Sequence, residues 1–334
     1  MNSWDELALF EIRDLAEDFY RDAHGGNLNA GKYKEIKTNL QQGRSYFSSA
    51  KNAAELVRPV LIYYGVLSLS RAAILFMNPE LRESSLKPGH GVSTVNWQNS
   101  LTGNSINYED LSVKFTSGTF MEFLVNGGNT EYFEIESTVY GGESKKAFNT
   151  ATQTLEQGCL LKLSDLLARI PDLEEMYRKV YGTESITFNV IVRESELGIV
   201  DNGRMFGYTN VSDITDKGIP GILREEGKVL KLSSSYKEGE EQEGLPFIST
   251  AWTGTLITHP FECSGKFINI SYIGKLYLAS YFVGMLARYF PTSWMCLIGK
   301  GRGAKIYPVI QDMLKVIEMK YSEKIVKLLK NKMA

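Results

Sequence analysis

Residues 59–77 read PVLIYYGVLSLSRAAILFM, and apolar side chains recur in this run on every face of a helix. Pro59 stands in the first turn of the helix that we predict over Val60–Met77, a position where its missing N–H costs nothing. Asn78 and Pro79 then end the run. A helix that is apolar all round must be covered on all sides. The sequence therefore predicts that Val60–Met77 is the central buried helix of the fold.

A second helix of the same kind is predicted over Ile273–Phe290, near the end of the chain. Its unbroken apolar part, Leu276–Ala287, is about a dozen residues long, whereas a membrane span needs roughly 20. We therefore favour a buried helix over a membrane span. Because both apolar helices need partners that hide them from water, we predict that they pack against each other in one core.

The remaining pattern places helices towards both ends of the chain and strands in the middle. Helices are predicted over 4–22, Gly43–Val57, Leu160–Tyr181 with a break at Pro171, and the basic amphipathic stretch Lys315–Lys332. Strands are predicted over Leu111–Phe115, Thr119–Val125, Ile186–Arg193, Met205–Tyr208, Lys228–Leu232 and Thr253–Thr258. The acidic run 237–244 is expected as a solvated loop.

This order of elements indicates the fold class. The strands do not alternate regularly with helices, as a doubly wound sheet would require. We predict an α+β fold in which N- and C-terminal helical blocks pack together and a small mixed or antiparallel β lobe comes from the middle of the chain. The expected parts are an N-terminal helical block (1–100), a mixed α/β lobe (101–265) and a C-terminal helical block (266–334).

Composition narrows the class of protein. The chain has 334 residues, 43% of them hydrophobic, and a net charge of -2, so no overall field points to nucleic acid or to an anionic membrane. A local basic patch is left open. The three cysteines (Cys159, Cys263 and Cys296) are far apart, which argues against a disulfide scaffold and fits a reducing cytosol. The N-terminus has no signal-peptide pattern. We expect a cytoplasmic protein with no membrane partner.

The common catalytic and metal-binding motifs are missing from the sequence. It contains no His-Glu-x-x-His, no Cys-x-x-Cys and no Gly-x-Ser-x-Gly. We therefore expect neither a metal site nor a cofactor.

His90, between Gly89 and Gly91, is the main catalytic candidate. Flanking glycines let a backbone approach a ligand closely, and histidine is the natural general acid or base at neutral pH. The other interpretation is a histidine that bonds to loop carbonyls and fixes a turn. Both interpretations stay open from the sequence.

Arg71 and Arg288 lie within apolar helices, where an unpaired charge is costly. Arg71 is a second catalytic candidate and Arg288 a ligand-binding candidate. Each either pairs with a carboxylate, such as Glu55 or Asp110, or binds an anion.

Three more ligand-binding candidates follow the second apolar helix. Trp294 comes after Pro291, which is expected to stop the helix and turn the indole back towards the core; its ring either packs there or stacks on a base. Lys300 and Arg302 alternate with glycines in Gly299–Gly303. That loop is either an anion contact, because glycines expose N–H groups, or a flexible basic connection.

The order of several short motifs resembles that of the YaaC-like family of bacterial proteins, over most of the chain. The motifs are Tyr46–Ala50, Arg58–Pro59 with Tyr63–Gly65, Gly89–Val92, Leu163–Pro171 and Ala287–Trp294. The resemblance supports the fold, and no established activity comes with it.

Two functions are expected. The first is a binding, sensor or scaffold module that recognises an anionic ligand (a nucleotide or nucleic acid) or a partner protein, in a bacterial defence or stress system. The alternative is a metal-independent ribonuclease with His90 and a nearby arginine, because a helical core with Arg and His loosely resembles HEPN-type ribonucleases. Arg82 precedes His90 by eight residues here, a longer spacing than in that family. The site is expected where Gly89–Gly91 meets the C-terminal helical block.

Overall fold

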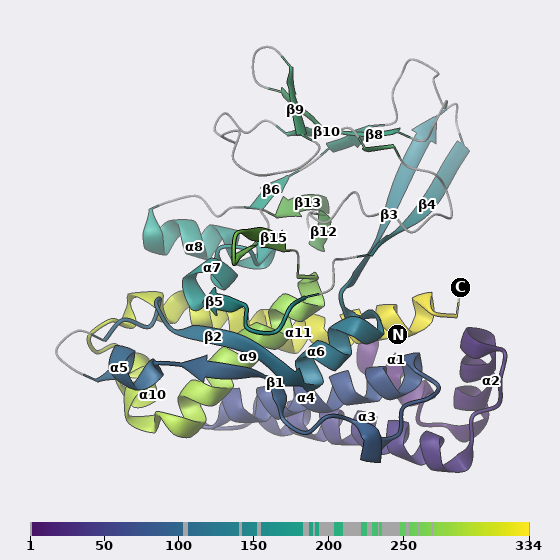
Figure 1. The fold of residues 1–334 in the computed structure, drawn as a ribbon, viewed down its shortest axis with the longest axis horizontal. Helices are drawn as coiled ribbons and strands as arrows, with labels where there is room; N and C mark the ends of the chain where they lie inside the picture. Colours follow the sequence, from purple (N-terminus) through teal and green to yellow (C-terminus); the bar gives the residue numbers. More distant parts are fainter. Residues whose placement is uncertain are drawn as a thin grey trace.

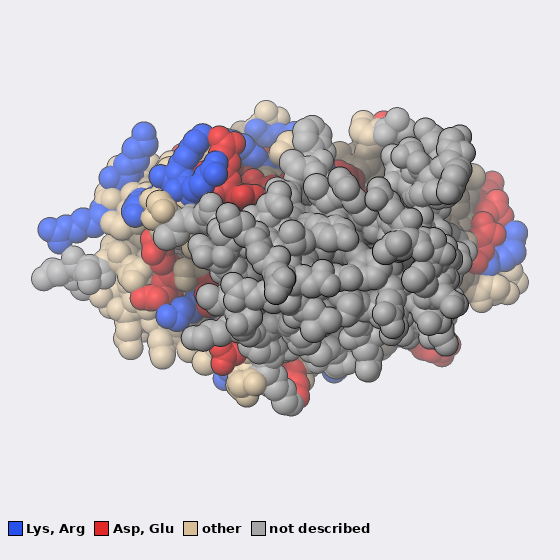
Figure 2. Space-filling model, turned by 90° about the horizontal axis from the view of Figure 1, so that it is seen from above, with Lys and Arg blue, Asp and Glu red and all other residues tan. Residues whose placement is uncertain are grey.

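The computed structural model describes residues 2–333 except for 103–105, 140–141, 152–154, 183–186, 190, 194–203, 210–221, 226–228, 233, 236–247, 252–253, 259–260 and 269. The acidic run 237–244, expected as a loop, lies outside the described residues. A helical body forms one layer, a small sheet lies against it, and further strands stand on the other side of that sheet (Figure 1). Basic and acidic side chains occur together at both ends of the molecule in the view from above (Figure 2).

The helices are concentrated in the first and last parts of the chain. They are α1 (Ser3–Leu9), α2 (Arg13–His24), α3 (Ala30–Lys51), α4 (Arg58–Met77), α5 (Trp97–Leu101), α6 (Thr119–Phe123), α7 (Leu163–Leu167), α8 (Glu174–Tyr181), α9 (Tyr272–Tyr289), α10 (Pro291–Ile298) and α11 (Tyr307–Asn331). Short helical turns are η1 (Glu83–Ser85), η2 (Leu124–Gly128), η3 (Pro171–Leu173) and η4 (Ala304–Ile306).

The strands form several small antiparallel sheets. The sheet nearest the helices has the order β1 (His90–Val95), β2 (Ser112–Gly118), β5 (Leu160–Lys162). The others are β3 (Thr130–Val139), β4 (Gly142–Ala151), β6 (Thr187–Asn189), β7 (Ile191–Arg193), β8 (Arg204–Thr209), β9 (Ile222–Glu225), β10 (Val229–Leu232), β11 (Ser234–Ser235), β12 (Ile248–Ala251), β13 (Gly254–Thr258), β14 (Phe261–Cys263) and β15 (Lys266–Ile268). The α+β class is therefore confirmed.

Helix α4 lies at the centre of the helical body, as its all-round apolar sequence predicted. Residue Tyr63 is fully buried against α9, where a Cβ on Gly284 would come within 2.7 Å of the tyrosine Cβ. Ser70 and Tyr321 join α4 to α11 through their hydroxyl groups, 2.6 Å apart. The prediction that the two apolar helices pack together in one core is confirmed, and with it the packing of the N- and C-terminal helices.

Helix α3 begins earlier than predicted. The sequence placed its start at Gly43, but Asn29 caps the helix by accepting a hydrogen bond from the Lys32 amide at 2.8 Å. Gly43 lies inside the helix because α4 approaches closely there. A Cβ at Gly43 would come within 2.7 Å of the Leu69 side chain, and one at Gly65 within 2.6 Å of the Phe47 ring. The glycine marks a helix–helix contact and not a helix start.

Three further predicted elements are corrected. Thr119–Val125, predicted as a strand, contains helix α6, and the partners of β2 are β1 and β5. The helix predicted from Leu160 begins as β5, because Leu161 pairs with Val113. The helix predicted over 4–22 is divided into α1 and α2. The chain turns at Phe10, whose buried ring packs on Phe19 and Phe76 with centroid distances of 4.8 and 5.5 Å.

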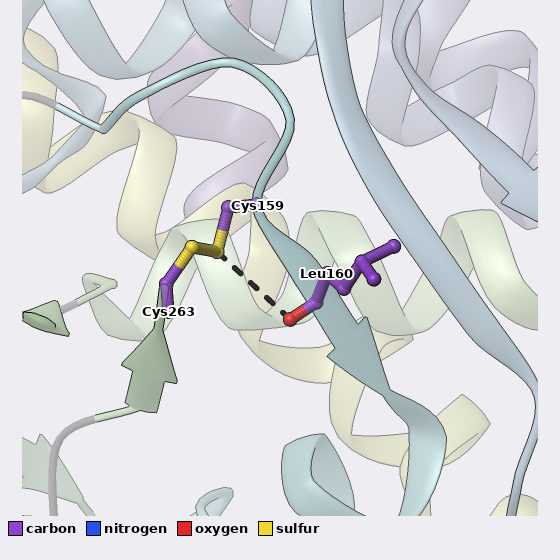
Figure 3. The surroundings of a disulfide bond; sticks show 3 residues. All are labelled: Cys159, Leu160 and Cys263. Atoms are coloured by element: carbon purple, nitrogen blue, oxygen red, sulfur yellow. Dashed lines mark hydrogen bonds between the residues drawn. A yellow bond between two sulfur atoms is a disulfide. The ribbon is translucent and has the colours of Figure 1, made fainter. Parts of the chain in front are cut away.

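The cysteines also differ from the expectation. Cys159 and Cys263 form a disulfide across a sequence separation of 104, with their Cα atoms 5.5 Å apart (Figure 3). Cys159 directly precedes β5 and Cys263 ends β14, and the fold brings these strands together. Distance in the sequence was a poor guide here because long-range strand contacts decide the geometry.

Among the described residues, one helix is long and apolar enough to cross a membrane: α4, with a mean hydropathy of 1.8. Of the window that meets this test, 67% is buried, and α3, α9 and α11 pack around it. This burial is consistent with the core helix of a soluble protein.

Lys32 donates hydrogen bonds to the carbonyl oxygens that follow the C-terminal end of α4. Its side chain is buried, and Nζ donates to the carbonyl oxygens of Asn78 (2.6 Å), Pro79 (2.8 Å) and Leu81 (2.7 Å). The chain just beyond a helix C-terminus carries carbonyls that need donors, and a cation is favoured there. Burial lowers the pKa of Lys32 to about 8, so the ammonium group stays charged at neutral pH.

Replacing Lys32 by Met is expected to lower the free energy of unfolding by about 3 kcal/mol, because three carbonyls lose a shared buried donor. Urea unfolding followed by circular dichroism measures the change. Lys34→Met, an exposed position on the same helix, is the matched control and should stay within about 0.5 kcal/mol of the wild type. Equal stabilities of the two variants would contradict this role.

Reduction of the Cys159–Cys263 disulfide is expected to lower the free energy of unfolding by about 2–4 kcal/mol, since the bond closes a long loop. Thermal unfolding with and without dithiothreitol measures the effect. Cys263→Ser should unfold at a lower temperature and no longer respond to the reductant. Cys296→Ser, at the free cysteine, should keep the full response. If the melting temperature of the wild type is the same with and without dithiothreitol, the prediction is refuted.

Candidate functional site

His90 begins strand β1 at the point where β1 meets α4 and α9, and is not in a loop as the sequence suggested. Its Nδ1 lies 2.5 Å from the Tyr63 hydroxyl on α4, and its carbonyl oxygen accepts a hydrogen bond from Tyr277 on α9 at 3.0 Å. Gly91 and Gly118 let β1 lie close to the end of β2 and the start of α6. A Cβ at either residue would come within 2.6 Å of a backbone nitrogen. His90 is therefore held by both helical blocks, its half-buried imidazole by Tyr63 and its backbone by Tyr277.

The tyrosines around this imidazole keep their protons at neutral pH, and Arg288 is the charged group that acts on it. Burial, and then the positive charge of Arg288, lower the pKa of His90. Burial raises the pKa of Tyr63 far above its usual range and that of Tyr281 to about 12. A Tyr63 hydroxyl that keeps its proton can donate to Nδ1, which leaves the proton of the neutral imidazole on Nε2.

Arg288, in the last turn of α9, is exposed and in contact with aromatic rings. Its guanidinium group donates to the Tyr64 hydroxyl and lies 5.7 Å from the centre of the Tyr64 ring and 4.9 Å from that of Tyr289. Tyr46 on α3 stacks on Tyr64 with centroids 5.6 Å apart. These rings fix the position of the arginine and place an aromatic surface beside it.

Among the described residues, neither arginine forms the ion pair that was one of its two expected roles. Glu55 accepts hydrogen bonds from Tyr307 and from Gln311, and Asp110 pairs with Lys162 at 3.1 Å. In the described part of the chain, no carboxylate pairs with Arg288.

Arg71 is half-buried on α4, and its Nε is buried without a hydrogen-bond partner. None of the ion pairs among the described residues includes it. Arg82, the other arginine near His90 in the sequence, forms two hydrogen bonds to Glu35 at 3.0 and 2.7 Å.

The other three candidates lie in or after α10. Trp294 is fully buried, and its Nε1 donates to the Glu55 carbonyl at 3.2 Å, so the indole is part of the core, as the turn at Pro291 predicted. Lys300 and Arg302 are exposed in the connection between α10 and η4. A helix precedes this loop, whereas a phosphate-binding loop of the P-loop type follows a strand.

Tyr277 and Tyr281 are site residues that the sequence interpretation missed. Their spacing of four, with Arg288 seven residues beyond, puts all three on one face of a helix. The His90 ring lies 5.8 Å from that of Tyr281. Within the described ranges, no group of three or more His, Cys, Asp or Glu side chains comes together as a metal site.

Comparison with known proteins identifies the family. The family model described as YaaC-like Protein matches residues 10–329. The chain belongs to this family. The curated proteins and the solved structures gave no match.

Arg288→Met is expected to raise the pKa of His90, because it removes a positive charge that opposes the imidazolium form. NMR titration of the imidazole Cε1 proton measures the shift. The pKa of His90 is lowered from 6.5 in the folded protein, so the stability that the neutral imidazole contributes is fully present above that pH and is lost as the pH falls. Arg288→Met should therefore lose less stability than the wild type when the pH is lowered. Arg13→Met, an exposed change on α2, should leave the titration alone. An unchanged pKa in Arg288→Met would be inconsistent with the geometry.

Proposed function

We propose that this YaaC-like protein binds a nucleotide or a single-stranded nucleic acid at the surface formed by Arg288, Tyr64 and His90. The observation that carries the proposal is the environment of Arg288. Two tyrosines hold its exposed guanidinium, and no carboxylate among the described residues neutralises it. Such an arginine keeps N–H donors free for a phosphate. A guanidinium group can form bidentate hydrogen bonds to two phosphate oxygens.

The aromatic rings favour a ligand that carries bases. Tyr289 is 57% exposed, and Tyr46 and Tyr64 form a stacked pair beside the arginine. Base–aromatic stacking contributes about 1–3 kcal/mol per base and tolerates different sequences. The Nε2–H of neutral His90 adds a donor without adding charge. Phosphate and base contacts are thus supplied side by side on a protein whose overall charge is slightly negative.

Ligand recognition at this point suits a sensor or scaffold. The surface combines groups from α4, α9 and β1, so a bound ligand would touch both helical blocks at once. We propose this role within a bacterial defence or stress response, where nucleotides and nucleic acids are the available ligands. A partner protein is the less favoured ligand, because an arginine framed by tyrosines matches phosphate and base together.

One observation favours the alternative function, a metal-independent ribonuclease. The arginine close enough to lower the pKa of His90 is Arg288, and neither Arg71 nor Arg82 has that effect. In the other tautomer, in which Nδ1–H donates to the Tyr63 hydroxyl, Nε2 is free to accept a proton from a ribose hydroxyl while the arginine stabilises the phosphate. The same binding experiment separates the two functions if the length of the RNA is checked afterwards.

Fluorescence anisotropy with a labelled 12-nucleotide RNA tests the proposal. Arg288→Met and Tyr64→Leu should each weaken binding by roughly tenfold, as expected for loss of about 1–3 kcal/mol. Affinity should fall as salt rises, with a smaller slope in Arg288→Met. Lys315→Met, an exposed control on α11, should bind like the wild type.

Wild-type affinity in both Arg288→Met and Tyr64→Leu would overturn the proposal. Shortened RNA after incubation with the wild type, and intact RNA with His90→Gln, would establish the ribonuclease instead.

A further inference from the structure

One stripe of α4 is not fully covered by the surrounding helices. Val60, Tyr64, Leu67 and Arg71 are each half-buried, whereas most of the positions between them are buried. Their spacings of four, three and four put them on one face of the helix. The stripe begins beside Arg288, which contacts Tyr64, and runs along α4 to Arg71.

Arg71 is the unexplained group of this stripe. Its Nε is buried without a hydrogen-bond partner, whereas nearly all buried donors in proteins have one. Two carboxylates on elements that flank α4 are engaged elsewhere. Glu122 on α6 accepts from the Lys87 amide at 3.2 and 3.1 Å, and Glu35 on α3 accepts from Arg82 at 2.7 Å. A half-buried guanidinium with an unused donor therefore lies at the far end of the stripe.

The spacing along α4 sets the size of the ligand. Arg71 is seven residues beyond Tyr64, the residue whose hydroxyl accepts from Arg288, and seven residues correspond to about 10 Å along a helix axis. Successive phosphates of a stacked strand are about 3.4 Å apart along its axis, so this distance corresponds to roughly three nucleotide steps. A mononucleotide can reach one arginine at a time, whereas a short single strand can reach both.

We infer that Arg71 is a second phosphate contact and that the ligand is an oligonucleotide lying along α4 from Arg288 to Arg71. This inference rests on the proposed function. Tyr64 then contacts a base or ribose next to the first phosphate, and Leu67 offers an apolar surface to the middle of the strand. The phosphate then meets the terminal nitrogens of Arg71, which form no ion pair among the described residues, because Nε itself is buried.

A length series of RNA tests the inference. Uridine monophosphate, a tetranucleotide and a 12-nucleotide RNA are titrated against the wild type, Arg71→Gln, Arg71→Lys, Arg288→Met and the exposed control Arg178→Met. Arg71→Gln should weaken the tetranucleotide and the 12-mer roughly tenfold and leave the monophosphate unchanged. Arg288→Met should weaken all three. Arg71→Lys, which keeps a point charge, should lie between wild type and Arg71→Gln.

The outcomes separate this inference from the proposed function. If Arg288→Met weakens binding while Arg71→Gln and Arg71→Lys bind every length like the wild type, the second contact is refuted and the first survives. Equal losses for monophosphate and tetranucleotide in Arg71→Gln also refute it. If no RNA binds the wild type, both fail. Urea unfolding of each variant shows whether it is folded, and Arg71→Lys carries the test if Arg71→Gln is not.

Discussion

The burial of α4 on nearly all sides is the constraint on which the rest of the structure depends. A helix with apolar residues all round cannot face water, and helices α3, α6, α9 and α11 pack around this one. Two of these contacts rely on glycine. Gly43 and Gly65 bring α3 close, and Gly284 makes room for Tyr63 at the contact with α9. The first and last parts of the chain are thereby joined in a single core.

Polar groups inside this core then determine where the candidate site lies. A buried hydroxyl is costly unless it is hydrogen-bonded, so Tyr63, Tyr277 and Ser70 each need a partner. Tyr63 finds the imidazole of His90, Tyr277 its carbonyl oxygen, and Ser70 the hydroxyl of Tyr321. Two of these bonds converge on one residue of β1. They fix that strand against both helical blocks beside the exposed Arg288.

The sequence pattern correctly predicted the features that depend on residues close together in the chain. The all-round apolarity of α4 and α9 identified the two central helices and their contact correctly. The interpretation was wrong where a distant partner decides the structure. Gly43 looked like a helix start because the close helix behind it is not visible in the sequence. Cys159 and Cys263 looked independent because the contact of β5 with β14 spans 104 positions.

Two arginines of the candidate site were predicted from the sequence. Arg71 and Arg288 were identified because a charge in an apolar helix needs an explanation, and a carboxylate partner was the expected one. The helix geometry gives a different solution. Both arginines stand at less covered positions, where a long side chain can bury its stem and direct its charged head towards water. A charge placed in this way needs no carboxylate for the fold. Guanidinium groups that form no ion pair among the described residues keep donors for an anion, and this is the physical reason for proposing the ligand on this side of α4.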